Sequence, residues 1–133
     1  QLIQLPCPEF IMYGSQRWGH VKNQFQHPFY KEQCRKLLDT ILLQVQEYMQ
    51  YPETFSVLGV VSVEGSPIAD ITLPVGKGEI GSDEKRICAI QNSLEMTEKP
   101  GVYMEILEKE IHDRELSIPI MTMAEAIELL NKL

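Results

Sequence analysis

The sequence has no long apolar run and only three cysteines. No stretch approaches the roughly 20 apolar residues that a membrane-spanning helix needs. No basic and apolar leader opens the chain, so we expect neither a membrane protein nor a secreted one. The cysteines, Cys7, Cys34 and Cys88, are odd in number and widely spaced, which does not fit a disulfide framework and favours a reducing cytoplasm. They also lack the close Cys/His pairs that are typical of a zinc site.

Basic residues are fewer than acidic ones, and the two kinds are distributed unevenly. The formal net charge of −7 argues against binding to nucleic acid. No acidic residue occurs from Phe10 to Lys31, where Arg17, His20 and Lys22 lie. This segment is either a solvated loop or a locally positive surface that would suit a small anionic or electron-rich ligand.

Alternating strand and helix patterns predict a single α/β domain over residues 1–133. Residues 55–63 form a continuous, β-branched run, as in a strand buried on both faces. We predict strands at 2–5, 55–63, 87–90 and 117–121. We predict one helix at 29–50, a second helix that begins at Gly101, and a third that begins at a capping box formed by Thr122 and Glu125. The first two strands and the helix between them would form a parallel βαβ unit. The predicted fold is a small three-layer domain with a mostly parallel sheet, Rossmann-like or flavodoxin-like.

Two helices carry predictions about the core. Cys34 lies on the apolar face of the helix at 29–50, so we expect a buried core cysteine rather than a ligand. The C-terminal helix is expected to bury Ala126, Ile127, Leu129 and Leu130.

Cys7 stands between two prolines and precedes the carboxylate of Glu9. Proline fixes φ and removes a backbone donor, so Pro6-Cys7-Pro8 predicts a stiff exit from the first strand. Such stiffness suits a thiol whose direction matters for function. A small buried side chain at a strand end is the alternative.

Chemically active side chains follow three of the predicted strands. Ligands of open α/β sheets bind outside the carboxyl ends of the strands, so we expect these side chains to meet at one edge. They are Cys7 and Glu9, then Glu64, Gly65 and Ser66, then Met121 and Thr122. The segment 7–27, predicted to be a long loop, would lie over this edge with Tyr13, Arg17, Trp18 and His20.

These segments together resemble the thiouracil desulfidase family, and within it a branch of related desulfidase-like proteins. The likeness begins at Gln4-Leu-Pro-Cys-Pro-Glu9 and passes through Tyr13-Gly14 and Arg17 to residues 30–35. It continues in Gly59-Val-Val-Ser-Val-Glu-Gly-Ser-Pro67 and resumes more weakly at 101–107 and 117–120. The resemblance therefore covers most of the chain.

The resemblance implies a compact α/β domain that holds a 4Fe–4S cluster on three cysteines, with one iron open to take sulfur from a thiolated pyrimidine. This sequence departs from the family pattern in two places. It begins at the family's second strand, so we expect an N-terminal strand-and-helix segment to be missing, and Ala69 replaces the third ligand cysteine. Cys7 alone corresponds to a cluster ligand, and one thiolate cannot hold a cubane.

Three functions remain as hypotheses. We favour a desulfidase-like domain without its cluster, in which Cys7 is a vestigial ligand. It would bind a small heterocyclic or anionic ligand through Tyr13, Arg17, His20, Gly65 and Pro67. The second hypothesis is an active sulfur-removing enzyme whose cluster a missing segment completes, with Glu9 as acid/base and Ser66 orienting the substrate. The third is a non-catalytic homodimer that covers the sheet edge left by the missing strand.

Overall fold

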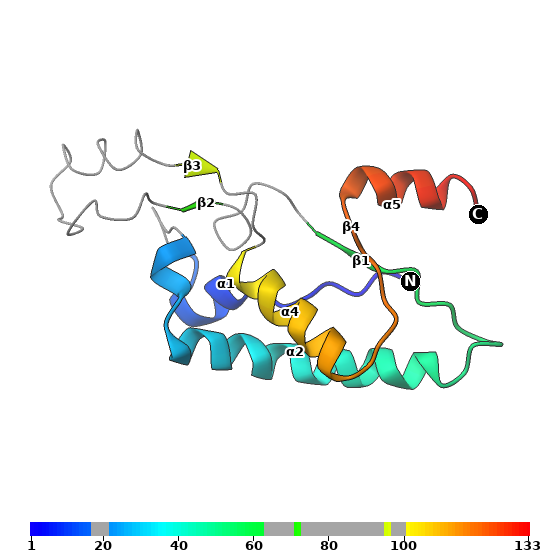
Figure 1. Cartoon of the computed structure of the whole chain (residues 1–133), viewed down its shortest axis with the longest axis horizontal. Coiled ribbons are helices and arrows are strands. Elements are labelled where there is room, and N and C mark those ends of the chain that lie inside the picture. The colour runs from blue at the N-terminus through cyan, green and yellow to red at the C-terminus, as the bar shows by residue number, and fades with distance from the viewer. Residues whose placement is uncertain (17–21, 63–70, 73–94, 97–100) are drawn as a thin grey trace, which may run out of the picture.

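The computed structural model describes residues 1–16, 22–62, 71–72, 95–96 and 101–133. This part of the chain is mixed α/β, with helices packed beside short strands (Figure 1). The predicted strand at 87–90 lies outside the described residues.

Helix α2, Pro28–Met49, is the longest element and confirms the helix predicted at 29–50. Pro28 occupies its first turn, where the missing N–H costs nothing. The imidazole Nδ1 of His27 accepts a hydrogen bond from the Tyr30 amide at 3.2 Å and so caps the helix. The buried side chains recur every four residues and make a single apolar stripe, formed by Tyr30, Cys34, Leu38 and Leu42. Cys34 is thus a core residue, as predicted.

Helix α4, Val102–Asp113, follows Gly101 as predicted and packs along α2. Its inward side chains are Val102, Tyr103, Leu107 and Ile111. Beyond its end, the guanidinium of Arg114 donates to Asp39 at 2.6 Å and to Glu110 at 3.3 Å. Arg114 therefore ties the end of α4 to the middle of α2.

The parallel sheet is shorter than predicted and pairs different segments. Strand β1, Val60–Val61, runs parallel to β4, Ile120–Met121, with Val60 opposite Ile120. Residues 1–7 form no strand, so the predicted βαβ unit of 2–5 with 55–63 is not formed. A second pair, β2 (Ile71–Thr72) and β3 (Glu95–Met96), is antiparallel. A strand is defined by its partner, and the local apolar pattern at 2–5 specified none.

The segment 7–27 is not one long loop. It contains helix α1, Pro8–Tyr13, and a 3₁₀ turn η1, Lys22–Phe25. The prolines around Cys7 therefore lead into a helix rather than stiffening the exit from a strand, because proline at the first helical position is preorganised for the helix. Helix α1 contacts α2.

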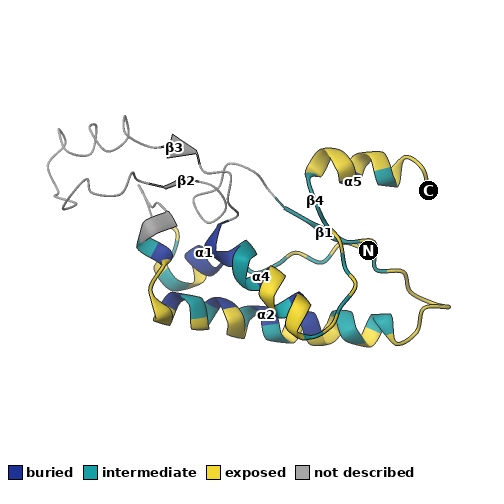
Figure 2. Cartoon of the chain, viewed as in Figure 1, coloured by how far each residue is buried: buried dark blue, intermediate teal, exposed yellow. Residues whose placement is uncertain are grey.

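Helix α5, Met123–Leu130, begins with the predicted capping box. The Thr122 hydroxyl accepts from the Glu125 amide at 3.3 Å, and the Glu125 carboxylate accepts from the Thr122 amide at 2.7 Å. The prediction of its buried face is wrong in part. Ala126 is buried, but Ile127 and Leu130 are 53% and 60% exposed (Figure 2).

The core lies where α1, η1, α2 and α4 meet, and Val60 of β1 and Ile120 of β4 pack against it. In Figure 1, α5 and the α2–α4 pair stand on opposite sides of β1 and β4. Among the described helices, none is long and apolar enough to cross a bilayer.

Candidate functional site

Cys7 marks the start of α1. Its Sγ accepts a hydrogen bond from the Phe10 amide at 3.4 Å, and its carbonyl accepts from the Ile11 amide at 3.1 Å. A thiol in this position takes the part that a serine or aspartate oxygen usually takes at a helix start. The side chain is half-buried and packs against the core cluster. The helix therefore fixes the direction of the Cys7 thiol.

Glu9 lies in the first turn of α1 and is buried, with 9% of its surface exposed. A carboxylate is favoured near a helix N-terminus, because the first amides of the helix carry partial positive charge. Burial of a carboxylate is costly unless its environment compensates for the lost water. Glu9 is therefore held at a specific place beside the core.

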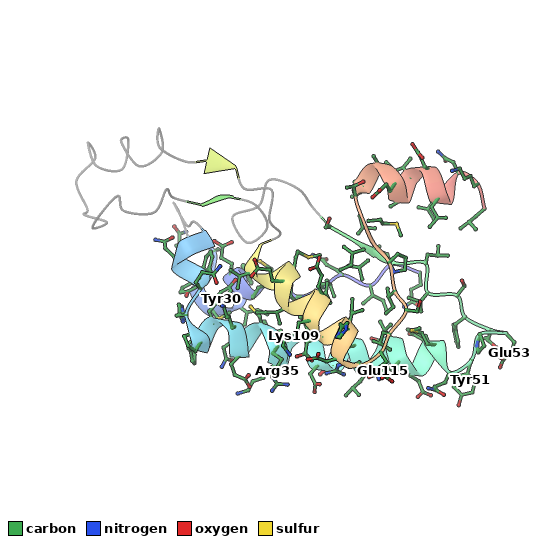
Figure 3. The ribbon with its side chains drawn as sticks, viewed as in Figure 1. Tyr30, Arg35, Tyr51, Glu53, Lys109 and Glu115 are labelled. Carbon is green, nitrogen blue, oxygen red and sulfur yellow. The ribbon has the colours of Figure 1, made fainter. Side chains whose placement is uncertain are left out.

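Three aromatic side chains lie together at the N-terminal end of α2. The rings of Phe25 and Tyr30 are 4.6 Å apart between centroids, and Tyr13 lies 6.0 Å from Phe25 and 6.5 Å from Tyr30. These separations are in the range of favourable aromatic pairs. The three residues come from η1, α2 and the end of α1, so the group holds these elements together. Figure 3 shows Tyr30 at the end of α2 that lies next to α1.

Two buried hydroxyls in this region have no oxygen or nitrogen hydrogen-bond partner in the described part of the chain. They belong to Tyr30 on α2 and Tyr103 in the first turn of α4. Tyr30 is completely buried and Tyr103 is 7% exposed. Buried hydroxyls in proteins almost always have a partner. The Tyr30 hydroxyl interacts with the Cys34 thiol, a weak partner, whereas the Tyr103 hydroxyl has none in the described part of the chain.

The electrostatic surroundings keep both phenols protonated. Burial raises the pKa of Tyr30, and the nearby Cys34, Glu9 and Cys7 raise it further. Burial likewise raises the pKa of Tyr103, with Cys34 and Cys7 adding to the effect. Both hydroxyls therefore remain hydrogen-bond donors at neutral pH, and both lie within electrostatic reach of the same two thiols.

Cys34 is unsuited to ligate a metal. Burial raises the pKa of its thiol to about 12, and the nearby Tyr30 hydroxyl offsets this only in part. The thiolate is the form that binds metals, so the neutral Cys34 thiol is a poor ligand. Among the described residues, no group of three or more Cys, His, Asp or Glu side chains is arranged to hold a metal ion. The residues that the structure describes therefore do not fit a cluster held on three cysteines.

The structure describes some of the predicted site residues and not others. Cys7, Glu9 and Tyr13 belong to α1 or its cap, and they lie near Tyr30. The Thr122 hydroxyl is engaged in the cap of α5. The predicted residues that lie outside the described part are Arg17, Trp18, His20, Glu64, Gly65, Ser66, Pro67 and Ala69.

Tyr30 and Tyr103 were not predicted from the sequence as site residues. Tyr30 precedes Cys34 by one helical turn, and Tyr103 opens the apolar stripe of α4, so both were recognisable as inward-facing positions. Nothing in the sequence distinguishes a buried tyrosine that has a hydroxyl partner from one that has none.

Comparisons with known proteins add little about function. No protein-family model matches the sequence, and no solved structure matches it. The uncharacterized protein MJ0003 of Methanocaldococcus jannaschii is 40% identical over 70 residues, which are 53% of this chain and 43% of that protein. The matched part of this chain thus spans less than half the length of the curated relative.

Proposed function

We propose that this chain is a desulfidase-like α/β domain that binds a small heterocyclic or anionic ligand beside Cys7 and Glu9, without a three-cysteine iron–sulfur cluster. The observation that carries the proposal is the start of α1, which directs the half-buried Cys7 thiol beside the core and holds the buried carboxylate of Glu9 two residues further on. Ligand sites typically combine apolar side chains with a few placed polar groups, and Cys7 packs against the apolar core cluster.

The side chains offer complementary chemistry to such a ligand. The buried phenol of Tyr103 would supply a donor, and the carboxylate of Glu9 is an acceptor of N–H groups. A pyrimidine-type ring carries N–H groups next to carbonyl or thiocarbonyl groups and would use both. Tyr13, with its ring against Tyr30, would supply a flat surface for stacking.

The finer fold is part of the same proposal. We expect a three-layer domain with a mostly parallel sheet, Rossmann-like or flavodoxin-like, that lacks its first strand. The parallel pairing of β1 with β4 and the placement of helices on both sides of this pair support it. A cytoplasmic location stays a prediction.

The test compares ligand binding and metal content in one preparation. The protein is purified without oxygen, assayed for iron and acid-labile sulfide, and titrated with uracil, 2-thiouracil and inorganic phosphate by calorimetry. We expect binding of at least one probe, loss of that binding in Glu9→Gln, and no change in Glu53→Gln. Glu53 is an exposed control at the far end of α2 (Figure 3). Failure of all three probes to bind would refute the proposal.

The metal assay separates this proposal from the active enzyme. A brown protein with stoichiometric iron and sulfide would contradict the cluster-free site. Release of sulfide from 2-thiouracil by that protein would favour the enzyme instead, with Glu9 as the acid/base and Ser66 orienting the substrate.

A second candidate function is a homodimeric interaction domain, favoured by α5. Met123, Ile127 and Leu130 recur at i, i+4 and i+7, so they share one face of α5. Each is more than half exposed. Helical geometry places the uncharged Ala124 and Asn131 beside this face. The same geometry directs the carboxylates of α5 away from this face.

The occupant that best suits this face of α5 is a second copy of the chain. A protein of net charge −7 repels its own copies unless the contact surface is uncharged, and this face meets that condition. Light scattering should give the mass of a dimer. Leu130→Glu should give a monomer, whereas Lys132→Gln, which makes the same change in net charge away from the face, should not. A monomeric wild type would eliminate this candidate.

A further inference from the structure

The outer side of β4 is an open sheet edge in the described part of the chain. Within that part, β4 pairs with β1 alone, and the carbonyls of Pro119 and Met121 accept hydrogen bonds from β1 at 2.8 and 2.9 Å. Backbone groups alternate in direction along an extended chain, so Ile118 and Ile120 point their amides and carbonyls away from β1. No hydrogen bond joins these outward groups to a described residue.

The position of Pro119 leaves this outer edge able to pair. Proline has no amide hydrogen and blocks pairing on the side to which its nitrogen points. The Pro119 carbonyl accepts from the Val60 amide, so the backbone of Pro119 faces β1. The missing donor is therefore on the inner side of β4. The outward residues, Ile118 and Ile120, both keep their amides.

The edge of β4 also lacks the charges that usually protect an edge strand. Proteins prevent edge-to-edge association with charged residues, bulges or outward prolines. Residues 116–124, which include β4, contain no charged side chain. In a protein of net charge −7, such a segment lets a second copy approach without bringing like charges together. The edge of β1 is less regular, because Gly59, with φ = +154°, directly precedes the strand.

The exposed face of α5 continues from this edge. Helix α5 begins at Met123, two residues after Met121 ends β4, and Met123 is more than half exposed. Ile127 and Leu130 share its face and are also more than half exposed. A short edge makes few hydrogen bonds and is not stable as a contact by itself, so it needs apolar surface beside it. The α5 face supplies that surface.

We infer that the outer edge of β4 pairs antiparallel with β4 of a second copy of the chain, and that the two α5 faces close over this contact. A two-fold axis makes the contact identical from both sides and makes the paired strands antiparallel. Ile118 of each copy would lie opposite Ile120 of the other, and the sheets would join into one. The inference rests on the homodimer given above as a second candidate function and adds its contact surface. It is independent of the ligand site at Cys7 and Glu9.

Hydrogen exchange followed by NMR tests the pairing in the wild type. The amides of Ile118 and Ile120 should exchange about tenfold more slowly, or slower still, in concentrated protein than in dilute protein, because only the dimer gives them acceptors. The amide of Tyr30 is the control, since it bonds to His27 at 3.2 Å and Tyr30 stands far from β4 (Figures 1 and 3). Its exchange should change much less with concentration.

A matched pair of variants tests the same contact by light scattering. Ile118→Pro removes one outward amide and should give the mass of a monomer, whereas Ile118→Val keeps the amide and should give a dimer. Circular dichroism checks that Ile118→Pro is folded. If it is not, the exchange of the wild-type amides decides the question.

The outcomes separate the edge contact from the homodimer itself. A wild-type dimer in which Ile118 and Ile120 exchange at the same fast rate at every concentration would overturn the edge contact, while a dimer through α5 alone would stand. Slow exchange of both amides in a monomer would overturn it as well, because another segment of the same chain would then cover the edge. A wild type that is monomeric at every concentration would eliminate both the edge contact and the homodimer, and would leave the proposed ligand site untouched.

Discussion

Gly59 provides a sharp test of how the short parallel sheet is held. It precedes β1 and has φ = +154°, a backbone conformation that side-chain-bearing residues rarely adopt. A Cβ added at this position would stand 2.8 Å from the Pro119 carbonyl oxygen and would also collide with the Met121 side chain. The same Pro119 oxygen accepts the Val60 amide at 2.8 Å, the bond that sets the register of β1 against β4. Gly59→Ala therefore strains the backbone and pushes the two strands apart.

The expected loss of unfolding free energy in Gly59→Ala follows from a comparison with Gly14. Gly14 also has a positive φ, +74°, but a Cβ there would meet nothing within 4 Å. Gly14→Ala should therefore cost only the backbone strain, about 1–3 kcal/mol of unfolding free energy. Gly59→Ala adds a steric clash with backbone atoms, which overpacking data put at about 1–3 kcal/mol. We expect Gly59→Ala to lose about 3 kcal/mol or more.

Urea denaturation followed by circular dichroism measures both variants. With a slope of about 1–2 kcal/mol per M for a small domain, the two midpoints should differ by about 1 M. Equal midpoints for Gly59→Ala and Gly14→Ala would show that the contact between residue 59 and Pro119 is unimportant.

Three further predictions concern single elements. The pKa of the Cys34 thiol is 9.0 in the unfolded chain and about 12 in the folded one. The free energy of unfolding should therefore fall as pH rises through this interval, by up to about 1.4 kcal/mol per pH unit. Cys34→Ala should make this decrease smaller when it is measured by urea titration. Thr122→Ala should destabilise α5 by about 1 kcal/mol in hydrogen exchange. Arg114→Ala should lower the free energy of unfolding by about 1–3 kcal/mol in urea titration, because it leaves the nearly buried Glu110 unpaired. Arg35→Ala breaks an exposed ion pair and should lower it by under about 1 kcal/mol. Equal losses in the two variants would contradict this difference.

The helices were predictable because their information is local. The apolar stripe of α2, the glycine before α4 and the capping box of α5 each lie within one segment of sequence. Side chains three and four residues apart must share a face, whatever the rest of the chain does. The structure confirms all three helices within one or two residues at the ends predicted.

The strands were less predictable because their information is distant. The run 55–63 looks like a central strand, but of its described residues, 55–62, the strand β1 includes only Val60 and Val61, and its partner strand lies sixty residues further along the chain. Residues 2–5 have the same apolar character and find none in the described part. An apolar pattern shows which residues can enter a sheet, but pairing decides which do.

The turn at Pro6-Cys7-Pro8 shows the limit of arguing from one residue type. Proline ends strands and also begins helices, since it lacks the amide that both positions leave unused. The acidic residue two places after Cys7 favours the helix, because a carboxylate in the first turn suits the helix dipole. The prediction that the Cys7 thiol has a fixed direction remains, although α1 rather than a strand fixes it.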